Sequence, residues 1–364
     1  MTNVVKRLLY HEQKKWFNRN NWSIFQDHLL SKGVTSYRHP TTTTAGLDDK
    51  VVFLGDENQI NHFNANPADI AKNIIVSRNG PQWEKVGQDI DGEAAGDQSG
   101  YSVSLSADGS IVAIGAPFND GNGNNSGHVR VYEFKEGSWE QLGEDIDAEA
   151  AGDLSGYSVS LSADGSIVAI GAYQNDGNNG VHSGHVRVYQ YDGSIWEQLG
   201  GDIDGEAVGD QSGWSVSLSA DGSVVAIGAI NNDGIFGNDS YSGHVRVYRH
   251  NPDKDDAVTD EDSPNYGPKG WDRIGKDING EAVADQSGFS VTLSADGTIV
   301  AIGSISNDAN DGTDSWRGHV QVYEFKEGSW KQKGTDIDGE AAEDWSGFSV
   351  SLSADGSVVA IGAP

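Results

Sequence analysis

The stretch from Gly100 to Pro117 reads GYSVSLSADGSIVAIGAP and contains the pattern that decides the fold. Tyr101, Val103 and Leu105 alternate with serines, which predicts a strand with one buried face. Asp108 and Gly109 follow, and both residues tolerate the left-handed backbone of a tight hairpin turn. Residues 111–114 are apolar on both faces, so we expect a second strand that is covered on both sides.

The same stretch recurs along the chain. It begins at Gly100, Gly156, Gly213, Gly288 and Gly347, and the last copy stops at Pro364 after two strands. Each complete unit adds an alternating strand that opens with a histidine and a fourth strand that carries a tryptophan. Four strands per unit at a period of about 57 residues predict an all-β fold, a β-propeller of four-stranded antiparallel blades.

The number of blades stays open at this point. Five blades are visible, and residues 73–90 resemble a third and fourth strand that could complete the fifth blade and close the ring. Residues 49–55 resemble a degenerate second strand, which favours instead a chain cut short from a propeller of six or seven blades.

Three regions are expected. Residues 1–36 are basic and predict a short helical N-terminal segment, either a cap on the neighbouring domain or an arm that docks on an acidic surface. Residues 37–82 would form the degenerate blade or the closing strands, and residues 83–364 the tandem propeller repeats. Residues 251–270 are charged and nearly free of apolar side chains, which predicts a mobile insertion.

Composition excludes several classes of protein. Lys and Arg total 24 against 55 Asp and Glu, a net charge of −31, which argues against a nucleic-acid partner. The sequence has no Cys, so it has no disulfide framework and no cysteine nucleophile. No apolar run approaches the roughly 20 residues of a membrane span, so no membrane insertion is expected.

The repeated cassette resembles the FG-GAP repeats of integrin-α-type propellers, in their shorter variant. Gly115-Ala116-Pro117 and Gly362-Ala363-Pro364 match the GAP half, and Ser155-Gly156-Tyr157 keeps the Gly of the FG half. The resemblance covers about residues 83–364 and implies a propeller. Calcium-binding members have an acidic loop between the first two strands, but only Ser-Ala-Asp-Gly stands there in this chain, so that site is not carried over.

Calcium is the one cofactor that the sequence suggests, and the candidate loops lie between the second and third strands. Their oxygen-bearing side chains at alternate positions are the ligands that calcium prefers, although an Asx-rich turn uses the same residues. The candidates are Asp120, Asn122, Asn124, Asp176, Asn178, Asp308, Asn310 and Asp314.

Other recurring polar residues are interpreted as structural. Asp97 and its copies stand two residues before a Ser-Gly and are expected to cap backbone amides. The histidines at 128, 185, 244 and 319 occupy one place in every unit, whereas an active site would break the symmetry, so no catalytic residue is predicted. Exposed side chains that differ between units are the better candidates for recognition by stacking or burial: Trp316, Trp345, Phe236, Tyr241 and His182.

These features lead to a functional prediction with alternatives. We expect a non-enzymatic binding or adhesion propeller that recognises a protein or glycan ligand, at the cell surface or outside the cell. One alternative is a structural intracellular scaffold module. Another is a propeller hydrolase or lyase that acts on a polysaccharide, which would need a unique pair of carboxylates.

Overall fold

The computed structural model describes residues 84–237, 240–260, 263, 265–308 and 316–364, together with the backbone of three short strands nearer the N-terminus. Two compact units, Met1–Lys85 and Val86–Pro364, are described separately. In the first unit, β1 (Ser36–Tyr37), β2 (Val51–Phe53) and β3 (Ile75–Ser77) form an antiparallel sheet in that order. The helical segment predicted within residues 1–36 lies outside the described residues.

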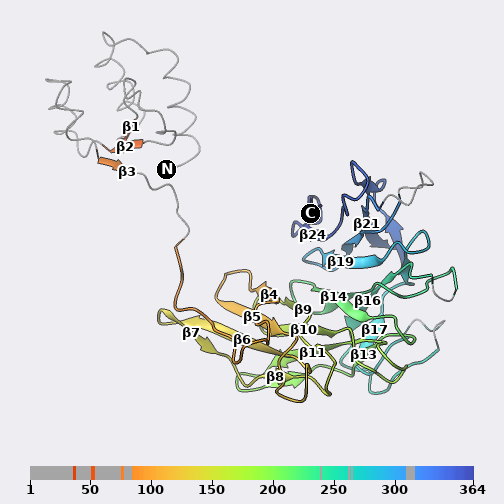
Figure 1. Cartoon of the computed structure of the whole chain (residues 1–364), viewed down its shortest axis with the longest axis horizontal. Helices are drawn as coiled ribbons and strands as arrows, with labels where there is room; N and C mark the ends of the chain where they lie inside the picture. Colours follow the sequence, from red (N-terminus) through yellow and green to blue (C-terminus); the bar gives the residue numbers. More distant parts are fainter. Residues whose placement is uncertain are drawn as a thin grey trace, which may run out of the picture. The chain divides into compact units, whose positions relative to one another are not determined.

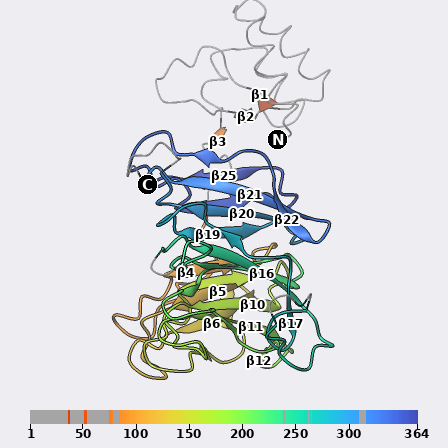
Figure 2. The same ribbon diagram turned by 90° about the vertical axis from the view of Figure 1, so that its right-hand side faces the viewer.

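The second unit is a series of antiparallel sheets, each built from consecutive strands of the chain (Figures 1 and 2). The first strands are β4 (Ser102–Leu105), β9 (Ser158–Leu161), β14 (Ser212–Leu218), β19 (Ser287–Leu293) and β24 (Ser349–Leu352). The second strands are β5 (Ile111–Ala116), β10 (Ile167–Ala172), β15 (Val224–Ala229), β20 (Ile299–Ser304) and β25 (Val359–Gly362). The third strands are β6 (His128–Lys135), β11 (His185–Tyr191), β16 (His244–His250) and β21 (His319–Lys326). The fourth strands are β7 (Ser138–Gln141), β12 (Trp196–Gln198), β17 (Trp271–Arg273) and β22 (Ser329–Gln332).

The predicted all-β fold of four-stranded antiparallel propeller blades is confirmed. The structure adds a short fifth strand to each of the four sheets, and this strand pairs with the start of the third strand. These strands are β8 (Ile146–Asp147), β13 (Ile203–Asp204), β18 (Ile278–Asn279) and β23 (Ile337–Asp338). The sequence analysis did not predict these fifth strands, because a strand of two residues gives no periodic hydrophobic signal. In the described part of the chain, no helix is long and apolar enough to cross a membrane.

The hairpin between the first two strands forms as the sequence predicts. Gly109 has a φ of 76°, and the Asp108 carboxylate accepts hydrogen bonds from the Ser106 hydroxyl (2.8 Å) and the Ser110 amide (2.9 Å). The second strand is then covered on both faces, because every residue of β10, β15 and β20 is buried. The core therefore lies between successive sheets.

Successive blades are joined by the same contacts each time. The first strands contact one another in the order β4, β9, β14, β19, β24, and their labels follow the inner side of the series in Figure 1. Beside them, each hairpin donates a backbone hydrogen bond to the next hairpin, as from Ala107 N to Ala163 O (2.8 Å) and from Ala295 N to Ala354 O (2.8 Å). The blade-to-blade interface is thus a repeated, directional contact.

The insertion at residues 251–270 is anchored at several points. Val258 and Gly267 form an isolated antiparallel bridge. The buried Lys254 ammonium donates to Trp271 O (2.6 Å) and Asn265 O (2.5 Å) and pairs with the Asp272 carboxylate (3.0 Å). The predicted mobility of the insertion stays a prediction.

The hairpin aspartates are expected to make the fold sensitive to acid. Hydrogen bonds from Ser110 and Ser106 hold the pKa of Asp108 at about 2, below its ordinary value of 3.8. A pKa that is lower in the folded state stabilises the protein above pH about 4, and this stability is lost as the pH falls towards 2. Carboxyl NMR should therefore place the Asp108 titration near pH 2, and Asp108→Asn should flatten the acid limb of the unfolding curve. A titration midpoint near pH 4 would contradict this assignment.

Candidate functional site

Each third strand opens with a buried histidine. His128, His185, His244 and His319 begin β6, β11, β16 and β21, and each is at most 3% exposed. The short fifth strand pairs with this end of the third strand, as in the His319↔Asp338 register. This pairing brings the acidic segment that follows the fourth strand against the imidazole.

Two carboxylates meet each imidazole. A glutamate comes from the segment before the sheet, and an aspartate comes from the segment after its fourth strand. The potential ligand atoms of each set lie within 4.8 Å of one another. We name the sets centre I (Glu93, His128, Asp145), centre II (Glu149, His185, Asp202), centre III (Glu206, His244, Asp277) and centre IV (Glu281, His319, Asp336).

Distances in centre I show how the groups face one another. His128 Nδ1 lies 3.9 Å from Glu93 Oε2 and 3.7 Å from Asp145 Oδ2. These separations are too long for hydrogen bonds, so the three groups surround a small space. In centre III, His244 Nδ1 lies 3.8 Å from Glu206 Oε2 and has no hydrogen-bond partner among the described residues.

The imidazoles of centres II and III are held in the neutral form by their surroundings. Burial and the nearby Arg187 lower the pKa of His185 to about 4, and burial also lowers the pKa of His244. Burial and the Asp202 carboxylate raise the pKa of Glu149. A neutral imidazole offers a lone pair to a cation, and this state is the one that metal ligation needs.

An arginine accompanies three of the four centres. Arg130, Arg187 and Arg246 lie two residues after the histidine on the same strand. The guanidinium of Arg187 is 3.8 Å from Glu149, and that of Arg246 donates to Asp277 (2.9 Å) and contacts Glu206. In these centres the arginine supplies positive charge to the two carboxylates.

Centre IV differs from the other three. Gln321 stands in place of the arginine and donates from Nε2 to Asp336 Oδ1 (2.9 Å), while the Tyr323 hydroxyl donates to Gln321 Oε1 (3.0 Å). Burial, together with the Glu281 and Asp336 carboxylates, raises the pKa of Tyr323 to about 12, so the phenol stays protonated. The side chain beside the carboxylates of centre IV is therefore an uncharged amide, and His319 Nε2 is buried without a hydrogen-bond partner among the described residues.

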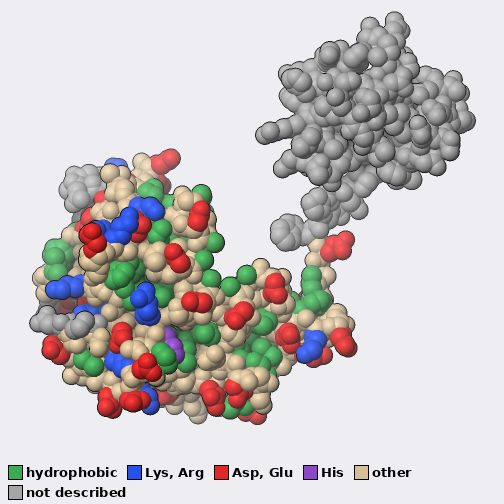
Figure 3. Space-filling view, turned by 180° about the vertical axis from the view of Figure 1, so that it is seen from behind, with side chains coloured by type: hydrophobic (Ala, Val, Ile, Leu, Met, Phe, Trp, Pro, Cys, Tyr) green, Lys and Arg blue, Asp and Glu red, His purple; other side chains and the backbone are tan. Residues whose placement is uncertain are grey.

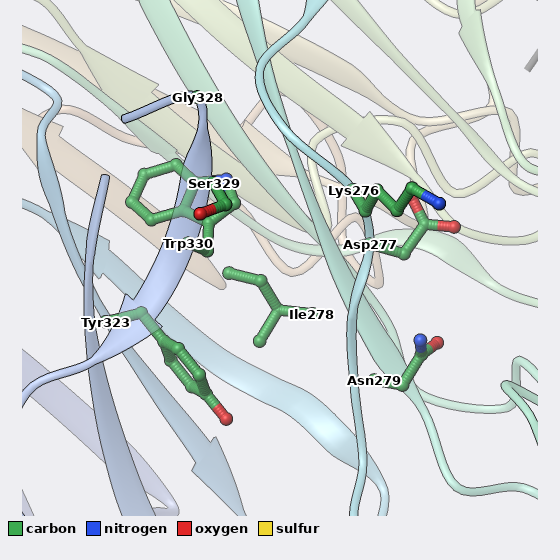
Figure 4. Close-up of a pocket in the computed structure, with 8 residues that line it drawn as sticks. All are labelled: Lys276, Asp277, Ile278, Asn279, Tyr323, Gly328, Ser329 and Trp330. Carbon is green, nitrogen blue, oxygen red and sulfur yellow. The ribbon is translucent and has the colours of Figure 1, made fainter. Parts of the chain in front are cut away.

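A pocket of about 420 Å³ is lined by Asp277 of centre III and by Tyr323, whose hydroxyl donates to Gln321 of centre IV. Figure 4 shows its two walls, the segment from Lys276 to Asn279 on one side and the strands that carry Tyr323 and Trp330 on the other. Tyr323 belongs both to this wall and to the hydrogen-bond chain that ends at Asp336. A small molecule in the pocket would therefore meet the Asp277 carboxylate of centre III directly, and its link to centre IV is through Tyr323 and Gln321.

The predicted calcium residues are distributed around separate loops. Asp120 Oδ1 accepts from Asn125 N (2.8 Å), Asp176 Oδ1 from His182 N (3.0 Å), and Asp308 Oδ1 from Trp316 N (3.0 Å), as expected for Asx-rich turns. Asn122 donates to Ala148 O, Asn178 donates to Asp204, and Asn124 O accepts from Gly152 N. Asn310 and Asp314 lie outside the described residues, and calcium binding at these loops stays a prediction.

Two of the recognition candidates share a pocket. Tyr241 and Trp316, both nearly half exposed, line a cavity of about 430 Å³ together with Gln286 and Ser306. Phe236, Trp345 and His182 are also exposed but do not line this cavity. The predicted amide caps are confirmed, since Asp97 Oδ2 accepts from Ala94 N (3.1 Å) and Asp153 Oδ2 from Ala150 N (3.0 Å).

The sequence analysis did not predict the four centres. It placed the histidines on strands but did not join them to Glu93 and its copies, which lie 35 to 38 residues earlier in the chain. The available signal was the recurrence of Glu, His and Asp once per unit, together with the single change from Arg to Gln at position 321.

Part of the sequence matches a known family of repeats. The FG-GAP repeat family matches residues 90–132, which contain the first two strands of the first unit and the start of its histidine strand. This part of the chain is thus similar to an FG-GAP repeat. The resemblance of the remaining FG-GAP-like units rests on their near identity to this one. No protein of curated function matches the sequence.

Two solved structures with similar folds carry the names of lactonases. A periplasmic gluconolactonase from Pseudomonas aeruginosa is 19% identical with a TM-score of 0.43, covering 71% of this chain and 64% of its own. A putative 6-phosphogluconolactonase from Bacteroides uniformis is 16% identical with a TM-score of 0.40, covering 71% of this chain and 57% of its own. This chain thus spans less than two thirds of the length of either.

These comparisons correct the functional prediction. Both similar structures are named as lactonases, so the comparisons contradict the predicted non-enzymatic binding or adhesion propeller and give it no support. At these identities and TM-scores the likeness concerns the fold. An activity for this chain has to be argued from its own residues.

Proposed function

We propose that this protein binds a divalent metal ion at centre IV and uses it in the hydrolysis of an ester bond. The observation that carries the proposal is the replacement of arginine by Gln321 at this one centre. Centres I to III hold two carboxylates, a histidine and a guanidinium, whereas an amide takes the guanidinium's place in centre IV. A divalent cation is the group that would balance its two negative charges.

The ligand types and spacing fit such an ion. An imidazole nitrogen with two carboxylate oxygens is a common set for zinc and related metals. Two ligands about 2.1 Å from one ion stand roughly 3.4 Å apart in a tetrahedral site. In centre IV the potential ligand atoms lie within 4.8 Å of one another, so inward movements of these side chains would complete the site.

The surroundings of centre IV supply the remaining parts of a hydrolytic site. Three protein ligands leave a position open for water, and a bound metal ion would lower the pKa of that water and polarise a carbonyl oxygen. Gln321 and Tyr323 orient the Asp336 carboxylate through their hydrogen bonds. The pocket lined by Tyr323 and by Asp277 of centre III provides room for a small substrate.

Metal binding is tested by thermal unfolding. The midpoint of the chelator-treated protein is expected to rise by several degrees with zinc or manganese, since a ligand at 100 times its Kd stabilises by about 2.7 kcal/mol. Gln321→Arg should remove this rise without unfolding the protein, because the same arginine is accommodated in the other centres. Arg187→Gln is the reciprocal variant. It should create a second metal site at centre II and so a further metal-dependent rise in the unfolding midpoint. An equal rise in the wild type and Gln321→Arg would contradict the assignment to centre IV.

Hydrolysis is tested with a lactone, the substrate class in the names of the two similar structures. Metal-loaded wild type is expected to open gluconolactone faster than the chelated protein does. Glu281→Gln, at an exposed ligand, should lose this activity, whereas the matched change Glu149→Gln in centre II should keep it. Metal-dependent stabilisation without any hydrolysis of lactones or simple esters would reject the catalytic part of the proposal and retain the metal site.

A further inference from the structure

The second strand of the fourth blade ends in a serine that the first three blades lack. Ser304 ends β20, whereas alanine ends the equivalent strands β5, β10 and β15, at Ala116, Ala172 and Ala229. The Ser304 side chain is 1% exposed, and its hydroxyl has no hydrogen-bond partner among the described residues. A buried hydroxyl without a partner destabilises a protein, so its presence at this one place needs an explanation.

Ser304 is the direct cross-strand neighbour of His319 in centre IV. The register of β20 and β21 pairs these two residues. Side chains that are directly opposed in an antiparallel pair point to the same face of the sheet, with Cβ atoms about 4.5–5.5 Å apart. His319 is also 1% exposed, and its Nε2 is likewise buried without a partner in the described part of the chain. Two unpartnered polar atoms thus belong to neighbouring side chains, within reach of a hydrogen bond after side-chain rotation.

The strand on the other side of Ser304 does not account for the serine. Ser287 of β19 is paired with Ser304, but a serine also stands at the equivalent place in the preceding blade, where Ser212 is paired with Ala229. The first-strand serine is therefore common to both blades, whereas the hydroxyl at position 304 is found only opposite His319. Ser304 and Gln321 are two changes in the fourth unit that adjoin the same centre.

The two nitrogens of a neutral imidazole have different roles. One nitrogen carries the proton and the other carries the lone pair, and the partner of the protonated nitrogen fixes which is which. In centres I to III, Nδ1 is the nitrogen that lies between 3.7 and 3.9 Å from a carboxylate oxygen. A lone pair on Nδ1 requires the proton on Nε2, and a group that accepts a hydrogen bond from Nε2–H stabilises this tautomer.

We infer that the Ser304 hydroxyl accepts a hydrogen bond from Nε2–H of His319 and so directs the Nδ1 lone pair towards Glu281 and Asp336. Ser304 is a positioning residue, because a hydroxyl on a side chain that is 1% exposed does not reach a substrate. The inference rests on the proposed function, since a metal ion at centre IV is the group that would use the lone pair. The tautomer itself belongs to the metal-free protein and is measured without the ion.

The tautomer is tested by NMR of the full chain with nitrogen-15 in its histidines, in chelator at a pH of about 8.5, well above the ordinary histidine pKa of about 6.5. Long-range proton–nitrogen correlations distinguish the two tautomers, and the His319 signals are those missing from His319→Gln. Wild type is expected to carry the proton on Nε2. Ser304→Ala is expected to give a mixture of both tautomers at His319, and it should fold because alanine occupies this place in the first three blades.

Zinc affinity provides the second readout. Loss of a residue that supports a metal ligand weakens metal binding by about 10- to 100-fold, so Ser304→Ala should raise the Kd for zinc by this factor. The reciprocal change, Ala172→Ser, faces His185 of centre II. Added to Arg187→Gln, it should tighten zinc binding at centre II by a comparable factor.

A matched control is needed because the surface itself attracts cations. The net charge is −31, and Figure 3 shows Asp and Glu side chains spread over the visible face of the described residues. Ser287→Ala removes another buried hydroxyl, from the strand on the other side of Ser304. It should keep both the wild-type tautomer of His319 and the wild-type Kd for zinc.

The outcomes separate this inference from the proposed function. An unchanged tautomer in Ser304→Ala overturns the inference, and so does an unchanged Kd in a protein that binds zinc, and either result leaves the metal site in place. A proton on Nδ1 of His319 in wild type also overturns it, because the hydroxyl would then donate to Nε2. If zinc does not bind wild type while Ser304→Ala shifts the tautomer, the hydrogen bond stands and the proposed metal site is wrong.

Discussion

Gly228→Ala is expected to destabilise the protein by at least about 3 kcal/mol, the upper part of the range for overpacking a core. Gly228 lies in β15, where a Cβ atom would stand 2.1 Å from the carbonyl oxygen of Gly288 in the next blade and 2.5 Å from Ser215 Oγ. The first of these neighbours is backbone held within the sheet, so it cannot rotate away as a side chain can. The midpoint of urea unfolding, followed by tryptophan fluorescence, measures the loss.

Gly362→Ala is the matched control for this prediction. Gly362 is the equivalent residue of the last hairpin, and its added methyl group would lie 2.4 Å from the flexible Ser349 hydroxyl with no backbone of another blade nearby. At low protein concentration it should shift the unfolding midpoint much less than Gly228→Ala. Equal shifts would show that the close approach of consecutive blades is not the cause.

Trp271→Ala is expected to cost roughly 3–5 kcal/mol, the range for removing a buried aromatic side chain. Trp271 is 0% exposed, its indole N–H donates to Leu199 O (2.9 Å), and its ring lies 5.3 Å from that of His250. Removing it leaves a cavity and an unpaired carbonyl between the second and third blades. Guanidinium unfolding at 25 °C should report the loss as a lower midpoint.

Trp139→Ala is the corresponding change in the first blade. Trp139 makes the same type of indole hydrogen bond, to Val86 O (3.0 Å), but its ring is only partly buried. Its replacement should therefore cost clearly less than that of Trp271. If the two variants lose equal stability, the additional burial of Trp271 contributes nothing.

The insertion at residues 251–270 is joined to the strand of Trp271 and to the preceding blade. Gly201 N donates to Lys269 O (2.8 Å), and Lys254 donates to Trp271 O. Sequence reasoning treated the insertion as a separate charged loop because its composition lacks apolar residues. The structure joins it to the strand that follows, through a lysine whose buried charge is paired with Asp272.

The local sequence pattern was sufficient to predict the strands and turns of the blades. The alternation of Val103 and Leu105 with serines, the Asp108-Gly109 turn and the apolar run after it predicted the hairpin correctly. The predicted amide cap at Asp97 was also correct. Each of these features depends on residues a few positions apart, where spacing in sequence and distance in space are nearly the same.

The candidate site could not be predicted in the same way. Glu281, His319 and Asp336 are far apart in sequence, and their meeting depends on the short pairing of β21 with β23. The equivalent centres in the other blades made the histidines seem purely structural. The difference at Gln321 acquires meaning only when the arginine at the same place in the other blades is seen to face the carboxylates.

The sequence by itself determined the repeated antiparallel blade, its turns and its order along the chain, because these follow from hydrophobic period and local backbone preference. Only the tertiary structure decided which carboxylates surround each histidine and which centre holds an amide in place of the guanidinium. Those properties depend on how whole blades pack. Packing brings residues together according to their place on the sheets, so their separation along the chain does not predict which residues meet.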